Sequence, residues 1–230
     1  MYKILIITLL IVCSKSLGQS VDYKNYSQFL KKYVSESGNV SYDKIKKSEL
    51  EDITDQFLSN PPAKSWSRED KLAYYINVYN AFTIKSVVDN YPVKSIKDIA
   101  GVWDKAYIKI NKIVYSLGDI ENKVLRKMDE PRIHFAINCA SFSCPKMSNN
   151  FYNPDKIEAQ LELATKDFFN DKSRNLFNSS ESKISMIFNW YEADFKKNGS
   201  IIDFLNKFSN AKIDKKTKIK FLDYNWSLNK

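Results

Sequence analysis

The segment from Ser67 to Asn90 constrains the fold more than any other part of this sequence. Ser67 is followed by acidic residues, which is typical of a helix start, and Pro92 lies just beyond the expected end. Apolar and aromatic residues occupy most faces between these limits, so we expect a helix that is covered by other elements on most sides. These residues are Leu72, Tyr75, Ile76, Tyr79, Phe82, Ile84 and Val87.

Two amides interrupt the apolar character of this segment. Asn77 and Asn80 are one helical turn apart and therefore lie on the same side of the expected helix. A buried amide without a hydrogen-bond partner costs about 1–3 kcal/mol. We therefore expect both side chains to bond to another segment and to hold it against the helix.

Apolar spacing predicts further helices around the central one. A first helix begins near Asp22, a second ends before Pro61, and a later one follows Pro154 and carries Ile157 and Leu161. Alternating residues from Tyr107 to Tyr115, interrupted by Asn111-Lys112, predict a β-hairpin. A short helix carrying Glu121 follows it, and a last helix covers residues 200–208.

Residues Arg132 to Asn138 show the clearest strand pattern. Ile133, Phe135 and Ile137 alternate with His134, Ala136 and Asn138, as expected of a strand with two different faces. The sequence therefore predicts a mostly helical α+β domain, in which the long buried helix packs against a small sheet containing the hairpin and the His134 strand. No boundary divides residues 19–230, and their length suits a single domain.

The only histidine and two of the three cysteines fall within eleven residues. His134, Cys139 and Cys144 are therefore the first place to look for a functional site. In one interpretation a cysteine thiolate attacks an ester or amide carbonyl, His134 transfers the proton, and Glu121, Asn77 or Asn80 orients the imidazole. This hypothesis predicts a thiol-dependent hydrolase or transferase.

Either cysteine is a candidate nucleophile. In a regular strand Cys139 lies on the face opposite His134, so the two meet only if a bulge or turn intervenes. Cys144 precedes Pro145, which favours a first helical position, so Cys144 could cap a helix whose amino end lowers its pKa.

Two other interpretations use the same residues. Removal of residues 1–18 as a signal peptide, which is argued below, leaves two cysteines in an exported chain. This count favours a Cys139–Cys144 disulfide, which makes the segment a non-catalytic binding or structural module. Zinc needs four ligands in a closed site, but Cys139, Cys144 and His134 supply three. We expect no metal and no cofactor.

Several separated motifs resemble the family known as domain of unknown function 547. They run in order from about residue 71 to residue 169, with a weaker match near the end of the chain. The motifs are Tyr75-Ile76-Asn77-Val78-Tyr79-Asn80-Ala81, Ile120-Glu121, Pro131-Arg132-Ile133-His134-Phe135-Ala136, Asn138-Cys139-Ala140-Ser141, Ser143-Cys144-Pro145 and Trp226-Ser227-Leu228-Asn229.

The family usually has tryptophan where this chain has Tyr75, and its name assigns no activity. The resemblance implies that the site to test contains Asn77, Asn80, Glu121, His134, Cys139 and Cys144. Asn138 and Ser141 flank Cys139 in the matching motif and are further candidate binding residues, together with Asn77 and Asn80.

The amino-terminal residues predict export. A short positive end, an apolar run from Ile4 to Val12 and the small residues Ser16 and Gly18 are typical of a signal peptide cleaved after Gly18. The run is too short to span a bilayer. Acylation at Cys13 is the alternative, although the preceding Val12 is bulky for it. We therefore expect a periplasmic or secreted protein without a transmembrane segment in its mature form.

The formal charge of +9 becomes +7 without Lys3 and Lys15 (9 − 2). The lysines are scattered among acids and form no arginine-rich arm, which argues against a specific nucleic-acid partner. Attraction of the run 212–220 to an anionic surface or polymer stays open. The expected substrate is an unidentified small or peptide-like molecule.

Overall fold

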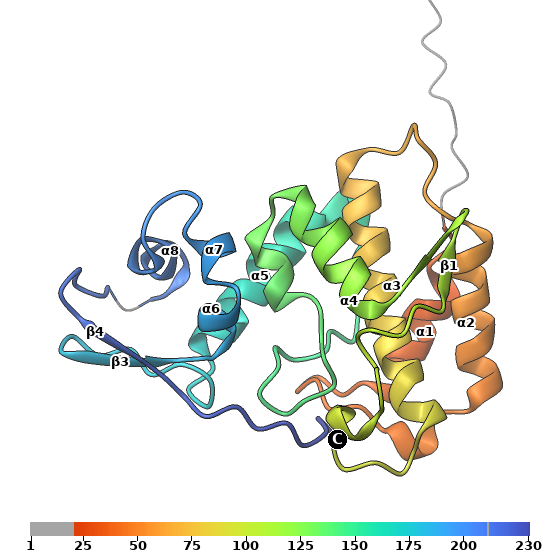
Figure 1. Ribbon diagram of the computed structural model, residues 1–230, viewed down its shortest axis with the longest axis horizontal. Coiled ribbons are helices and arrows are strands. Elements are labelled where there is room, and N and C mark those ends of the chain that lie inside the picture. The colour runs from red at the N-terminus through yellow and green to blue at the C-terminus, as the bar shows by residue number, and fades with distance from the viewer. Residues whose placement is uncertain (1–20, 211) are drawn as a thin grey trace, which may run out of the picture.

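The computed structural model describes residues 21–210 and 212–230, in which most regular elements are helices (Figure 1). The predicted signal peptide lies outside the described residues. Among those residues, no helix is long and apolar enough to cross a membrane. The α-helices are α1 (Lys24–Tyr33), α2 (Lys47–Ser59), α3 (Arg68–Asp89), α4 (Leu117–Asp119), α5 (Ile157–Asn170), α6 (Ile187–Trp190), α7 (Glu192–Phe195) and α8 (Ile201–Phe208).

Shorter elements join these helices. The 3₁₀ helices are η1 (Tyr42–Lys44), η2 (Ile96–Asp98), η4 (Leu125–Met128), η5 (Pro131–Phe135) and η6 (Pro154–Lys156), and η3 (Ile120–Val124) is a π-helical turn. The strands are β1 (Ile108–Ile110), β2 (Ile113–Tyr115), β3 (Glu181–Ile184) and β4 (Lys218–Phe221).

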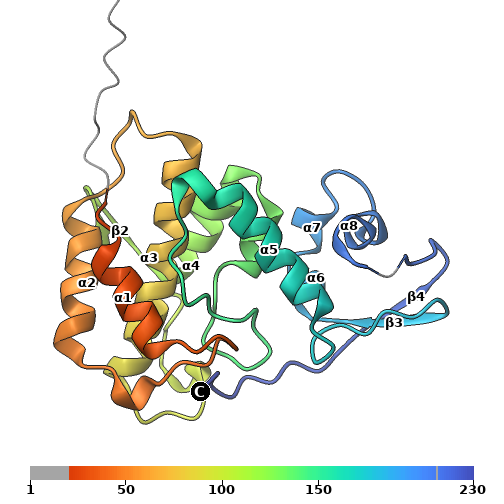
Figure 2. The same cartoon turned by 180° about the vertical axis from the view of Figure 1, so that it is seen from behind.

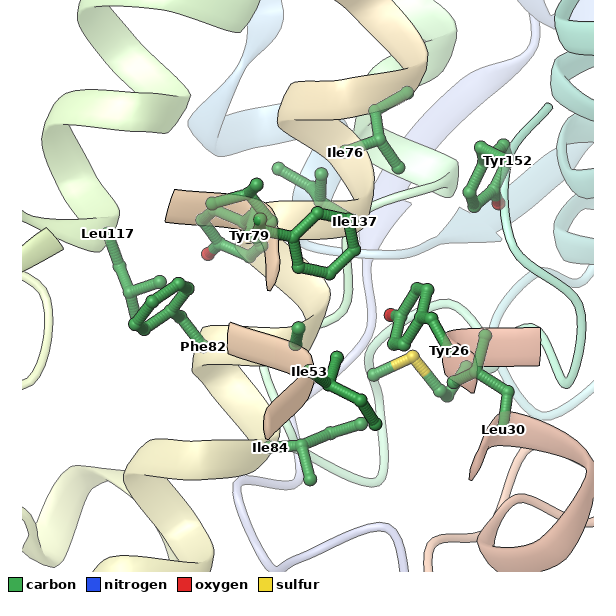
Figure 3. Close-up of a cluster of buried hydrophobic side chains, with 14 of the residues drawn as sticks. Tyr26, Leu30, Ile53, Ile76, Tyr79, Phe82, Ile84, Leu117, Ile137 and Tyr152 are labelled. Carbon is green, nitrogen blue, oxygen red and sulfur yellow. The ribbon is translucent and has the colours of Figure 1, made fainter. Parts of the chain in front are cut away.

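Helix α3 is the predicted buried helix. The Ser67 hydroxyl accepts a bond from the Asp70 amide, and the Asp70 carboxylate accepts one from the Ser67 amide, so the amino end is capped reciprocally. Figure 3 shows Tyr79, Phe82 and Ile84 among side chains from other elements, which include Ile53 and Tyr26. The mostly helical α+β class and the central helix are confirmed.

The two predicted parts of the sheet have different outcomes. Strands β1 and β2 form the expected antiparallel hairpin, and Asn111 in its turn has a φ of 55°. The His134 strand is wrong, because residues 131–135 form the 3₁₀ helix η5, which starts at Pro131 and is capped by the Glu130 side chain. Three consecutive residues of η5 are buried, namely Ile133, His134 and Phe135. The segment is therefore buried on several sides, and the alternation of apolar residues does not indicate a strand with one exposed face.

The buried side chains form two clusters. The larger one surrounds α1–α3 and the hairpin, and the smaller one consists mainly of phenylalanines from α5 to α8. Figures 1 and 2 show α1–α3 and α6–α8 at opposite ends of the molecule, with α5, which contributes to both clusters, between them. Helix η5 connects the clusters, because Ile133 belongs to the larger and Phe135 to the smaller.

The elements around the larger cluster form the large lobe, and those around the smaller cluster form the small lobe. The last residues return from the small lobe to the large one. Strand β4 pairs in parallel with β3, and the following segment runs back toward the large lobe (Figure 1). There the Phe142 amide bonds to the Ser227 carbonyl and the Ser143 amide to the Asn225 carbonyl. The C-terminal segment, residues 222–230, therefore lies against the loop that carries the cysteines.

Candidate functional site

A cavity lies between the two clusters, and the key candidate side chains meet in its wall. His134, Cys139, Cys144 and Glu121 all line it. The volume of the cavity is about 90 Å³, which is enough for a small chemical group. The other lining residues are Tyr79, Trp103, Ile137, Ile187, Trp190, Tyr191, Tyr224 and Trp226.

The loop that carries the cysteines is held by buried amides. Asn80 donates to the Ala136 carbonyl over 3.0 Å and accepts from the Asn138 amide over 2.8 Å. The Asn138 side chain in turn accepts from the Ala140 amide and donates to the Pro145 carbonyl, so it closes the loop across both cysteines. Ala140 has a φ of 58°, a left-handed conformation that costs energy for a residue with a Cβ.

Three potential donors surround the Cys139 sulfur. Cys144 Sγ lies 2.9 Å away, Ser141 Oγ 3.1 Å and Tyr224 Oη 3.3 Å. Hydrogen bonds to a thiolate favour the ionised form. The bond with Cys144 contributes most, burial acts against it, and the net effect lowers the pKa of Cys139 to about 7. Cys139 is half-buried and therefore combines a depressed pKa with partial access.

Cys144 has the opposite character. It is 4% exposed, and burial together with the neighbouring Cys139 thiolate raises its pKa well above the usual value. The prediction that Cys144 caps a helix is wrong, because residues 145–150 form no helix. No bond joins the two sulfurs in this structure. The two candidate nucleophiles therefore differ, since Cys139 has a depressed pKa and partial exposure whereas Cys144 is buried with a raised pKa.

The imidazole of His134 is fixed by residues that the sequence did not indicate. Its Nε2 lies 2.9 Å from Asp194 Oδ2, and its ring stacks on Tyr191 with centroids 3.8 Å apart. Since an ionised carboxylate only accepts, Nε2 carries the hydrogen, and Nδ1 has no hydrogen-bond partner among the described residues. In the neutral ring Nδ1 is therefore a buried acceptor without a partner, and the structure shows no hydrogen bond between it and the sulfur of Cys139 or Cys144.

Asp194 also binds Arg126. The guanidinium contacts both carboxylate oxygens, at 2.6 Å from Nε and 3.1 Å from Nη2. Burial raises the pKa of Asp194, but the bonds from His134 and Arg126 outweigh that effect and hold the pKa well below its usual range. The carboxylate is therefore ionised at neutral pH and fixes the orientation of the imidazole.

Glu121 lies on the π-helical turn η3, a type of irregularity that often occurs at functional sites. Its Oε2 accepts a hydrogen bond from the Tyr79 hydroxyl over 3.3 Å. Its Oε1 is buried and has no hydrogen-bond partner in the described part of the chain. The structure gives Glu121 no contact with His134 and assigns the orienting bond to Asp194 instead.

The remaining candidates have different surroundings. Asn77 exchanges two hydrogen bonds with the backbone of Tyr152, so it holds that segment as predicted and bonds to none of the cavity residues. Asn80 and Asn138 hold the cysteine loop from behind. Ser141 is the only one of the four predicted binding residues with a hydrogen-bond contact to Cys139 or Tyr224.

Sequence reasoning missed most of the site residues that follow α5 in the chain. No local motif marks Asp194, Tyr191 or Tyr224. Each of them contacts His134 or Cys139, which lies 57 to 85 residues earlier in the chain. Only the tryptophan of the Trp226-Ser227-Leu228-Asn229 motif pointed to this region. Trp226 packs against Trp103 and Trp190 in the cavity wall.

Residues 63–169 match the model of a family described as "Protein of unknown function, DUF547", and the chain resembles this family. The matched region contains the histidine, both cysteines, Glu121 and the two amides of α3, whereas Asp194 and Tyr224 lie beyond it. No curated protein and no solved structure matches the chain. Within residues 21–210 and 212–230, no group of three or more histidine, cysteine or acidic side chains is arranged to hold a metal ion.

Proposed function

We propose that this protein is a cysteine-dependent hydrolase or transferase that acts on an ester or amide, with Cys139 as the nucleophile. The observation that carries the proposal is the set of three donors around the Cys139 sulfur, in the wall of a cavity that His134 shares. A thiolate is the reactive form of cysteine, and a pKa near 7 makes it abundant at neutral pH.

The proposed reaction uses His134 as the proton carrier. Nδ1 accepts the proton of any Cys139 that is still a thiol, the sulfur attacks the carbonyl carbon, and a thioester forms as the alcohol or amine departs with that proton. Water or a second acceptor then attacks the thioester and releases Cys139. Asp194 keeps Nε2 protonated, which leaves Nδ1 free for both transfers.

Cys144 is the donor to the Cys139 thiolate in this proposal. Its burial and raised pKa keep it protonated, so it supports the nucleophile and does not replace it. Tyr224 donates to Cys139 from another direction, and the Ser141 hydroxyl beside them donates to Tyr224. Asn80 and Asn138 position the loop, and Asn77 acts only on the stability of the fold.

Hydrolysis of aryl esters and aryl amides by the reduced protein tests this function. We expect Cys139→Ala to abolish turnover and His134→Ala to reduce kcat by about 10²–10⁴-fold, as for the loss of a general base. Asn77→Ala is a control outside the cavity and should retain kcat. Unchanged turnover in Cys139→Ala would refute the proposal.

A second candidate function is a non-catalytic module with a Cys139–Cys144 disulfide. The specific observation in its favour is the 2.9 Å separation of the two sulfurs, which requires little movement for a bond. A thiol count on the protein purified without reductant and then denatured distinguishes the two, because denaturation exposes both sulfurs. Two free thiols support the enzyme, and none supports the module.

We also propose that the protein is exported after cleavage following Gly18. The sequence of residues 1–18 supports this proposal. Amino-terminal sequencing of the protein recovered outside the cytoplasm should begin at Gln19. A mature protein that begins at an acylated Cys13 would favour a lipid anchor instead.

A further inference from the structure

The charge of the cavity wall differs from that of the chain. The chain contains 36 lysines and arginines and carries a formal charge of +9. None of the twelve residues that line the cavity is a lysine or an arginine, and Glu121 is the one carboxylate among them. A strongly basic protein therefore presents an acidic and aromatic surface at its candidate site.

Glu121 is a buried carboxylate without a counter-ion. It is 6% exposed, and it forms no ion pair with any residue in the described ranges 21–210 and 212–230. Arg126 interacts with Glu121 through charge alone, and its guanidinium is held bidentately by Asp194. A buried charge without a partner is costly, and proteins keep such groups mainly where a ligand supplies the partner.

Aromatic rings form most of the remaining wall. Tyr79 donates a hydrogen bond to the Glu121 carboxylate. Tyr191, Tyr224 and three tryptophans also line the cavity. The faces of such rings attract cations. Two of the rings already contact cations from outside the cavity, since Lys97 Nζ lies 5.2 Å from the Trp226 ring and Arg126 Cζ lies 5.3 Å from the Tyr191 ring.

We propose that this cavity binds an ammonium group, with Glu121 as its counter-ion and the aromatic rings as its walls. The small volume suits one amine-bearing head group. Combined with the proposed function, on which this part rests, the substrate class is an ester or amide that carries a positively charged amine close to the bond that is cleaved.

Tryptophan fluorescence tests the binding directly, because Trp103, Trp190 and Trp226 line the cavity. The reduced full-length protein is titrated at pH 7 and constant ionic strength with n-butylammonium, 1-butanol or butyrate. We expect butylammonium to bind at least ten times more tightly than 1-butanol, and butyrate to bind more weakly than either.

Glu121→Gln removes the charge but keeps an acceptor for Tyr79, and Glu69→Gln removes the same charge from an exposed position on α3. We expect the preference for butylammonium over 1-butanol to disappear in Glu121→Gln and to persist in Glu69→Gln. Equal binding of both ligands by the native protein, or an unchanged preference in a folded Glu121→Gln variant, would overturn the inference. If Glu121→Gln does not fold, the comparison of ligands on the native protein decides.

Failure of this inference and failure of the proposed function give different results. Ammonium binding without any Cys139-dependent hydrolysis refutes the enzyme and leaves the ammonium site. Cys139-dependent hydrolysis with equal kcat/KM for aminated and neutral esters of the same shape refutes the ammonium site and leaves the enzyme.

Discussion

At the scale of single residues, the environment of one sulfur decides the chemistry. Cys139 and Cys144 are five residues apart and in contact, yet their pKa values shift in opposite directions. The Cys139 sulfur has two hydroxyl groups and the Cys144 thiol within hydrogen-bond distance, whereas Cys144 is more completely buried. Burial favours the neutral thiol and donors favour the thiolate, so the balance differs between the two.

Removing a donor should therefore raise the pKa of Cys139. In Tyr224→Phe the ring stays in the cavity wall and only the hydroxyl is lost, so we expect the midpoint of thiolate absorbance to move up from about 7 toward the ordinary value. Cys144→Ala should move it further, because Cys144 contributes the largest stabilisation. Tyr191→Phe is the matched control. A midpoint that stays at 7 in both donor variants would contradict this assignment.

The two amides of α3 provide a paired test of position against stability. Asn77 and Asn80 each form two hydrogen bonds with a distant backbone segment, so either change to alanine should lower the free energy of unfolding by about 2–3 kcal/mol in urea denaturation. Only Asn80 holds the cysteine loop. We expect Asn80→Ala alone to slow alkylation of Cys139, and equal slowing in Asn77→Ala would argue against this distinction.

At the scale of elements, helix η5 joins the two clusters. Phe135 is 1% exposed, and its ring packs against those of Phe168, Phe169, Phe188 and Phe195. The neighbouring His134 ring lies within 5.4 Å of the Phe195 ring. The packing of the small lobe therefore also positions the imidazole.

Phe135→Ala should destabilise the protein by about 3–5 kcal/mol, as expected for truncation of a buried aromatic residue. Phe221→Ala removes the same atoms from a ring that is 42% exposed and should cost less than about 1 kcal/mol. Chemical denaturation of both variants measures the difference. Similar losses would show that Phe135 does not connect the clusters in the way described.

Local patterns predicted the elements whose environment is simple. Helices α1, α2, α3 and α5 each have an apolar periodicity and a clear start or end signal, and the hairpin has Asn111 in its turn. The η5 segment was predicted as a strand because it is buried on several sides, and an apolar alternation then carries no information about period. Its Pro131 start was the signal that favoured a helical turn.

At the scale of the whole molecule, the site lies where the two clusters meet. The large lobe contributes Tyr79 and Ile137 to the cavity, and the small lobe contributes Ile187 and Tyr191. The sequence predicted that His134 and the cysteines gather at one place, because they are close along the chain. It did not predict Asp194 or Tyr224, because their approach depends on the packing of the lobes.

The Asp194 contacts connect the lobes and should make stability depend on pH in acid. The folded pKa of Asp194 is depressed, so its contribution is fully present above the unfolded value of about 3.9 and is lost as the pH falls from about 5 toward the folded pKa. Asp194→Asn should lower the free energy of unfolding by about 2 kcal/mol at pH 7. Between pH 5 and pH 3 the variant should lose less stability than the native protein does. Urea denaturation at several pH values measures both, and parallel curves for the two proteins would exclude this role.

The most direct test of the account is alkylation of the reduced protein by iodoacetamide between pH 5 and pH 10, resolved for each cysteine by peptide mass. We predict that Cys139 reacts with a midpoint near pH 7 and that Cys144 stays unmodified throughout the neutral range. Equal rates at both cysteines, or a Cys139 midpoint at the ordinary value near 8.5, would contradict the central claim that the fold stabilises one thiolate in this cavity.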